Sequence, residues 1–178
     1  MATPRIEVVP AAALDRATRA EILAVCSDAY EEDFSAYLAL LAGAVHVLAR
    51  LDGALVAHAA WVERPLHAEN LATPLRSAYV EAVAVPTALR GRGLGTQVLA
   101  ALPPLLEDYD VAALSPSEPG FYARLGWERW RGALWYRDGD TKVPTPEEEI
   151  MILRLPRTPT NLDLDASLGV DWRPLEVW

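Results

Sequence analysis

The chain has 178 residues, of which 52% are hydrophobic and 23% charged, and its net charge is −9. This length suits one globular core, so we expect a single domain over residues 1–178. The acidic balance excludes the usual nucleic-acid binder, because nucleic-acid recognition requires a basic face. We expect no membrane partner, since no apolar run reaches spanning length and the first residues lack a secretory signal. The single cysteine, Cys26, allows no internal disulfide and fits a cytoplasmic protein.

The first half of the chain predicts two strands that form a hairpin after a helical segment. We expect a strand at 6–9, helices at 15–29 and 34–41, and strands at 45–51 and 54–63. The dipeptide Asp52-Gly53 separates the last two strands. It is a strong hairpin signal, because a type I′ turn needs positive φ at both central residues.

The second half continues the alternation of strands and helices. The expected elements are a strand at 75–85, a helix at 96–106, a strand at 112–114, a helical turn at 120–125, and strands at 127–136 and 149–155. No internal repeat is visible. The order of elements predicts a mixed α/β (α+β) fold.

The most informative segment is the turn between the strand at 75–85 and the following helix. It contains two arginines and three glycines, namely Arg90, Gly91, Arg92, Gly93 and Gly95. The glycines permit positive φ and close approach to a ligand, and the arginines are forked donors suited to phosphate. Backbone N–H groups at a helix start bind anions. The turn lacks the lysine of a P-loop and the glycine spacing of the dinucleotide fingerprint. It therefore predicts a site for a pyrophosphate-bearing cofactor, the alternative being an ordinary strand-to-helix connection.

The pattern Arg-Gly-x-Gly-Leu-Gly after a strand ending in Val-x-Val resembles the acetyl-CoA pyrophosphate loop of the GNAT superfamily of N-acetyltransferases. The resemblance implies the GNAT fold, in which helices flank a mixed central β-sheet with a splayed pair of strands. It also implies acetyl-CoA as the cofactor. The cofactor-binding positions that it assigns are Val83, Ala84, Val85, Arg90, Gly91, Arg92, Gly93, Leu94, Gly95 and Thr96.

Residues 115–127 resemble a second element of the same superfamily, in which a tyrosine precedes a glycine-aromatic pair. Here the tyrosine is Tyr122 and the pair is Gly126-Trp127. A tyrosine hydroxyl is protonated at neutral pH and can donate its proton to the thiolate that acetyl transfer expels. The alternative is that Tyr122 only packs beside Phe121 and Trp127.

A closer resemblance, to the aminoglycoside 2′-N-acetyltransferases, covers most of the chain. The residues that support it are the strand sequence Tyr-Val-Glu-Ala-Val at 79–83, Pro-Thr-Pro-Glu-Glu at 144–148, and Asp-Trp-Arg-Pro-Leu-Glu-Val-Trp at 171–178. The resemblance implies that Glu81 acts as a base through water and that Trp178 and its α-carboxylate reach the antibiotic. It makes 156–178 a C-terminal tail that completes the acceptor site, and it implies a homodimer. The substrate-binding positions that it assigns are Asp33, Glu81, Ala82, Ser115, Glu147, Glu148, Glu176 and Trp178.

The charge pattern agrees with a polycationic substrate. An aminoglycoside carries several ammonium groups, for which carboxylates are the strong hydrogen-bond acceptors. Glu81 lies in an apolar strand, where desolvation would favour its action as a base, unless it faces solvent. Alternation places Glu81 and Val83 on one face of the strand. A backbone N–H within 83–85 would stabilise the thioester oxyanion.

Some features leave the substrate open. Relative to the pattern of the family that the chain resembles, serine, alanine and tyrosine occupy 35–37 in place of a second acidic residue, and glutamates replace aspartates at 147, 148 and 176. The three histidines, His46, His58 and His67, lack metal-binding spacing, so we expect structural roles and no metal. Two rival functions remain. One is acetylation of another cationic amine, and the other is non-catalytic binding of an aminoglycoside or an acyl-CoA.

Overall fold

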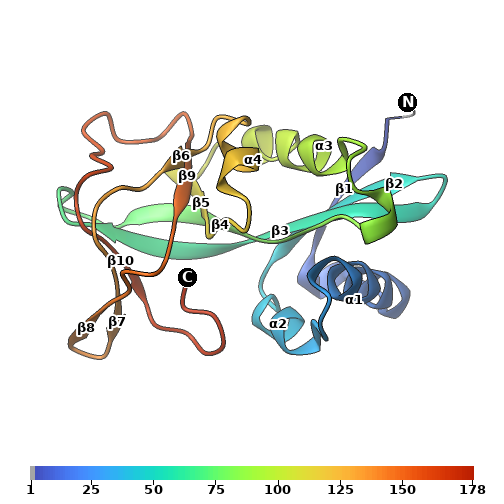
Figure 1. Ribbon diagram of the computed structural model, residues 1–178, viewed down its shortest axis with the longest axis horizontal. Coiled ribbons are helices and arrows are strands. Elements are labelled where there is room, and N and C mark those ends of the chain that lie inside the picture. Colours follow the sequence, from blue (N-terminus) through green and yellow to red (C-terminus); the bar gives the residue numbers. More distant parts are fainter. Residues whose placement is uncertain (1–2) are drawn as a thin grey trace. The chain divides into compact units, whose positions relative to one another are not determined.

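A computed structural model describes residues 3–178 of the chain. The chain forms two compact units, which Figure 1 shows with their helices and strands labelled. The first unit comprises Met1–Val62 and Val80–Leu105, and the second comprises Glu63–Tyr79 and Leu106–Trp178. The long strands β3 (Ala54–Ala68) and β4 (Leu75–Ala84) contribute residues to both units. Within residues 3–178, no helix is long and apolar enough to cross a membrane.

The strands of the first unit pair antiparallel. β1 (Arg5–Pro10) pairs with β2 (Val45–Leu51), and β2 pairs with β3. The predicted hairpin is confirmed, since φ is 50° at Asp52 and 84° at Gly53. Both central residues of this turn therefore have the positive φ of a type I′ turn.

The helices of the first unit cover the two faces of these strands. In Figure 1, α1 (Arg16–Tyr30) and α2 (Ser35–Leu40) lie on one face, and α3 (Leu94–Ala100) lies on the other. The Asp15 carboxylate caps α1 by accepting a hydrogen bond from the N–H of Thr18 at 2.7 Å. The apolar stripe of α1 is buried in the core at Ile22, Val25 and Cys26.

The helix after the glycine turn differs from its prediction. It begins at Leu94, two residues earlier than expected, and ends at Ala100 rather than at 106. A separate 3₁₀ turn, η3 (Pro103–Leu105), follows it. Proline inside a helix removes a hydrogen bond and clashes with the preceding turn, so the Pro103-Pro104 pair ends the regular helix.

The second unit is built on a mixed sheet, as predicted. The strand order is β6-β9-β5-β4-β3-β10-β7-β8. β5 (Val111–Leu114) runs parallel to β4 along Ser77–Tyr79 and antiparallel to β9 (Met151–Arg154). β10 (Leu168–Asp171) runs parallel to β7 (Leu134–Asp138) and antiparallel to β3. The short helix α4 (Pro119–Ala123) precedes β6 (Glu128–Arg129).

Two parts of this sheet were not predicted. The expected strand at 127–136 is divided into β6 and β7, because residues 130–133 bond elsewhere, including the N–H groups of Arg131 and Gly132 to the carbonyl of Leu164. The other part is β8 (Thr141–Pro144) together with β10. β10 depends on Gly169, where an added Cβ would lie 2.1 Å from the Trp135 ring.

Candidate functional site

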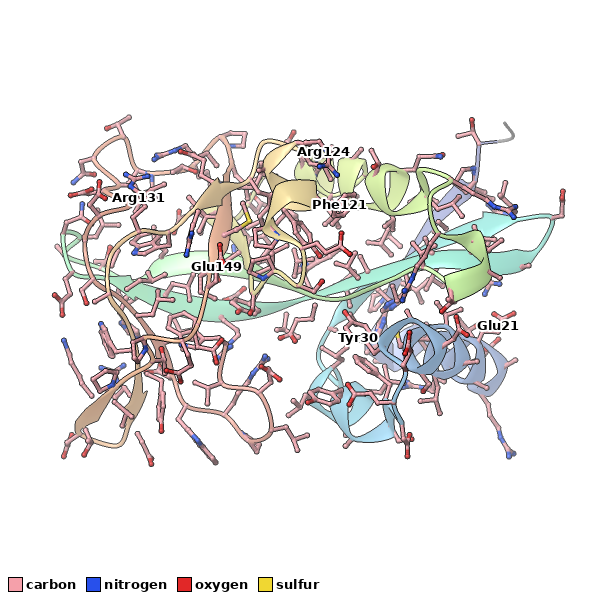
Figure 2. The ribbon with its side chains drawn as sticks, viewed as in Figure 1. Glu21, Tyr30, Phe121, Arg124, Arg131 and Glu149 are labelled. Atoms are coloured by element: carbon pink, nitrogen blue, oxygen red, sulfur yellow. The ribbon has the colours of Figure 1, made fainter. Side chains whose placement is uncertain are left out.

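The end of β4 has an unusual backbone conformation in the first unit. Ala82 has φ 51°, a left-handed conformation that costs an L-residue about 1–2 kcal/mol. The predicted alternation of the strand places its neighbours Glu81 and Val83 on one face. Both neighbours are half-buried, whereas Ala82 and Ala84 are buried. The Val83 carbonyl accepts a hydrogen bond at 3.3 Å from Tyr30, which is labelled in Figure 2 at the end of α1.

The glycine turn presents backbone donors, as predicted for an anion site. Gly91 and Gly93 have φ values of 76° and 74°, and open space surrounds the position of a Cβ on each. The prediction of positive φ is wrong for Gly95, which lies inside α3. The first helical hydrogen bond of α3 joins the N–H of Gln97 to the carbonyl of Gly93 at 3.0 Å. The N–H groups at positions 94–96 precede this bond, so they are available to phosphate oxygens.

The turn is attached to the end of α1 by side-chain hydrogen bonds. The N–H of Thr87 donates to the Asp28 carboxylate at 2.6 Å, and the Thr87 hydroxyl donates to the Asp28 carbonyl at 3.2 Å. One guanidinium nitrogen of Arg90 donates to the Ala29 carbonyl. Arg92 is exposed, and within residues 3–178 its guanidinium makes a single hydrogen bond, a long one of 3.5 Å to the Ala88 carbonyl. The turn is thus held in place, and Arg92 is the arginine best able to reach a phosphate.

Three of the predicted substrate residues are exposed, namely Asp33 in the first unit and Ser115 and Glu147 in the second. Asp33 precedes α2 in the first unit, and its carboxylate accepts hydrogen bonds from the N–H and the hydroxyl of Ser35. These bonds lower the pKa of Asp33, so the group stays ionised. In the second unit, Ser115 directly follows β5.

Tyr122 lies in α4, in the second unit, and is 6% exposed. Its ring contacts Phe121 and Trp127 edge to face, with centroids 5.1 and 6.0 Å away. Within residues 3–178, its hydroxyl has no hydrogen-bond partner. Burial, together with the charge of Glu118, raises the pKa of Tyr122 to about 12. The hydroxyl is therefore protonated at neutral pH and free to donate.

A cavity of about 560 Å³ in the second unit contains one of the predicted acidic residues, Glu148. Its lining comes from 129–134, 144–146 and 148–149, and it includes Arg131 and Glu149, which Figure 2 labels. Glu149 pairs with Arg129 at 3.0 Å, and Arg131 pairs with Asp165 at 2.6 Å.

Glu148 lines the same cavity but makes no ion pair with any residue in 3–178, and neither does its neighbour Glu147. Desolvation, followed by repulsion from Glu147, raises the pKa of Glu148. Two adjacent carboxylates without a counter-charge form a site that favours a cation.

The C-terminal tail is anchored in the second unit by buried polar contacts. The Trp178 ring is 1% exposed, and its Nε1–H donates to the Thr145 hydroxyl at 2.9 Å. Arg64 on β3 donates to the carbonyls of Val177 at 2.8 Å and of Asp171 at 2.9 Å. Thr145 also lines the cavity of Glu148, so the tail and this cavity share one residue.

Three of the residues that shape these features were not predicted as site residues. They are His58, Arg64 and Thr145. Their partners are backbone carbonyls or the indole of the last residue, and a carbonyl partner leaves no pattern in the sequence. No cluster of metal-binding side chains occurs in the part of the chain that the structure describes.

Most of this chain matches a known protein family. The profile of the acetyltransferase (GNAT) domain matches residues 16–130. An aminoglycoside 2′-N-acetyltransferase from Mycolicibacterium fortuitum is 38% identical over 173 residues, which span 93% of this chain and 87% of that protein.

Comparison with solved structures gives the same fold. The GNAT family N-acetyltransferase YhbS from Escherichia coli, in complex with CoA, has a TM-score of 0.66 and 20% identity. The alignment covers 97% of this chain and 92% of YhbS. The ribosomal-protein-S18-alanine N-acetyltransferase from Escherichia coli has a TM-score of 0.57 and 18% identity, with 89% of this chain and 99% of that chain covered. At these identities the likeness concerns the fold alone.

Proposed function

The chain belongs to the GNAT superfamily of acetyltransferases, and from this premise we propose that it acetylates an amine of aminoglycoside antibiotics, namely the 2′-amine. The cofactor of the family is acetyl-CoA, which supplies the acetyl group as a thioester. The observation that supports the proposed substrate is the 38% identity, over 93% of this chain, to an aminoglycoside 2′-N-acetyltransferase. Acetylation of this amine would remove a positive charge from the drug and so confer resistance.

The unpaired carboxylates of the second unit support a polycationic acceptor. Several exposed acidic side chains of this unit already have a cation, as Asp165 has Arg131 and Glu128 has Arg154. The adjacent Glu147 and Glu148 do not, within residues 3–178. An ammonium group bound there would relieve the repulsion between the two carboxylates. We assign them to the aminosugar rings that do not react, with Asp33, Ser115, Glu176 and the tail 156–178 as further contacts.

The chemical roles follow from the groups that the chain provides. Glu81 would take the proton of the attacking amine through a water molecule, with the Trp178 α-carboxylate as a second candidate base. Tyr122 would donate its phenolic proton to the sulfur as the carbon–sulfur bond breaks. The N–H groups of 83–85 and of the glycine turn would bind the pantetheine arm and the pyrophosphate. We further propose that the enzyme works in the cytoplasm as a homodimer.

A panel of amines tests the substrate class. Release of CoA from acetyl-CoA would be measured with an aminoglycoside, a polyamine and a peptide with a free N-terminus. We expect CoA release at micromolar to millimolar KM with the aminoglycoside alone. Release only with the polyamine or the peptide would replace the proposed substrate. Protection of bacteria by the protein in stoichiometric amounts, without CoA release, would indicate a binding protein.

The role of Tyr122 predicts a loss in turnover when its hydroxyl is removed. In Tyr122→Phe, kcat should fall on the order of 100-fold, because the departing thiolate loses its proton donor. The KM for acetyl-CoA should change by less than about threefold, since the hydroxyl acts in the transition state and binding of the cofactor is unaffected. Steady-state kinetics of Tyr109→Phe, a tyrosine that stacks with Arg76 instead, provide the control. An unchanged kcat in Tyr122→Phe would remove this residue from the acid role.

The cavity offers a matched pair of carboxylates. Glu148→Gln should raise the KM for the aminoglycoside roughly tenfold, because it removes a charge-assisted hydrogen bond of about 1.4 kcal/mol. Glu149→Gln removes a carboxylate from the same cavity whose charge Arg129 already neutralises, and it should change this KM by less than about threefold. Equal effects of the two substitutions on KM would contradict the assignment of Glu148.

A further inference from the structure

A chain of buried hydrogen bonds runs across the first unit to the left-handed residue of β4. His58 on β3 is fully buried, and its Nδ1 lies 2.7 Å from the carbonyl oxygen of Ala82. The Nε2 of the same ring lies 2.9 Å from Nδ1 of His46 on β2, which is 2% exposed. Two histidines thus connect three neighbouring strand segments through their side chains.

The direction of each hydrogen bond is determined by the groups involved. A carbonyl only accepts, so the proton between His58 and Ala82 belongs to Nδ1 of His58. Burial lowers the pKa of His58 to about 3 and that of His46 to about 4, so each neutral ring has one N–H near pH 7. The Nε2 of His58 must therefore accept, and Nδ1 of His46 must donate.

This chain of hydrogen bonds ends at the Ala82 carbonyl, which cannot be protonated near neutral pH. It therefore cannot relay a proton to β4, and its remaining effect is on backbone orientation. The peptide bond between Ala82 and Val83 is trans, since the described chain contains no cis peptide bond. In a trans peptide the C=O and N–H groups point in opposite directions. The bond from His58 to the Ala82 carbonyl consequently turns the N–H of Val83 away from the core histidines.

We propose that His58, held by His46, is a positioning residue for acetyl transfer: it fixes the peptide after Ala82 so that the Val83 N–H faces the thioester carbonyl. The proposal rests on the proposed function only in placing the thioester at residues 83–85. Without the His58 bond, Ala82 could relax from its left-handed conformation and rotate this donor. A catalytic donor displaced in this way stabilises the developing oxyanion less well.

Two variants of His58 separate its effect on the orientation of the Ala82–Val83 peptide from its effect on core packing. The side-chain nitrogen of asparagine can take the place of Nδ1, whereas leucine fills the space without a donor. We expect kcat of His58→Asn to stay within about threefold of the wild type, and kcat of His58→Leu to fall roughly 10- to 100-fold. The KM for acetyl-CoA should remain within about threefold in both. Cys26→Ala is the control, because this thiol lies 3.7 Å from the same nitrogen, and it should leave kcat unchanged.

Equal losses of kcat in the asparagine and leucine variants would overturn the proposal, because asparagine restores only the donor. A second measurement needs no substitution and no acceptor substrate. Nitrogen-15 NMR of histidine-labelled wild-type protein should show His58 as the neutral Nδ1–H form at pH 7. A neutral Nε2–H form would overturn this inference alone, whereas failure of the amine panel would overturn only the proposed substrate.

Discussion

The conformation of β4 at Ala82 is the constraint on which the proposed cofactor site of this protein depends. A non-glycine residue with φ 51° persists only where its surroundings hold it. Here the fully buried His58 holds Ala82 by donating a hydrogen bond to its carbonyl. The same strand leads into a turn that Thr87 and Arg90 fasten to the end of α1. A strand end and a glycine turn are thereby both fixed before any ligand arrives. Preorganised backbone donors of this kind need no rearrangement when charge develops on a substrate.

In the second unit the notable feature is the distribution of charged side chains. Arginines neutralise Glu149 and Asp165, and Arg64 donates hydrogen bonds to two carbonyls of the tail. Against this background Glu147 and Glu148 form a repelling pair without a cation among the described residues. Such a pair costs stability unless a ligand supplies the missing charge. A net charge of −9 adds a general attraction for polycations.

Local patterns predicted much of the fold. The Asp52-Gly53 turn and the strand at 45–51 depend on neighbouring residues, and each was found as expected. β10 was missed because it is short and is stabilised by partners distant in sequence, β3 and β7. The glycine turn was recognised, yet its three glycines could not be told apart, and Gly95 proved helical. His58 and Arg64 donate to backbone carbonyls, which every residue has, so only the structure reveals these bonds.

The proposed acceptor is the 2′-amine of an aminoglycoside, and a pair of drugs that differ at this position distinguishes it from the other amines of the drug. CoA release from acetyl-CoA would be measured with an aminoglycoside that has a 2′-amine and with one that has a 2′-hydroxyl instead. If the 2′-amine is the acceptor, CoA is released with the first drug only. Equal release with both would show that another amine is acetylated and would contradict the proposed position, and release with neither would contradict the proposed substrate.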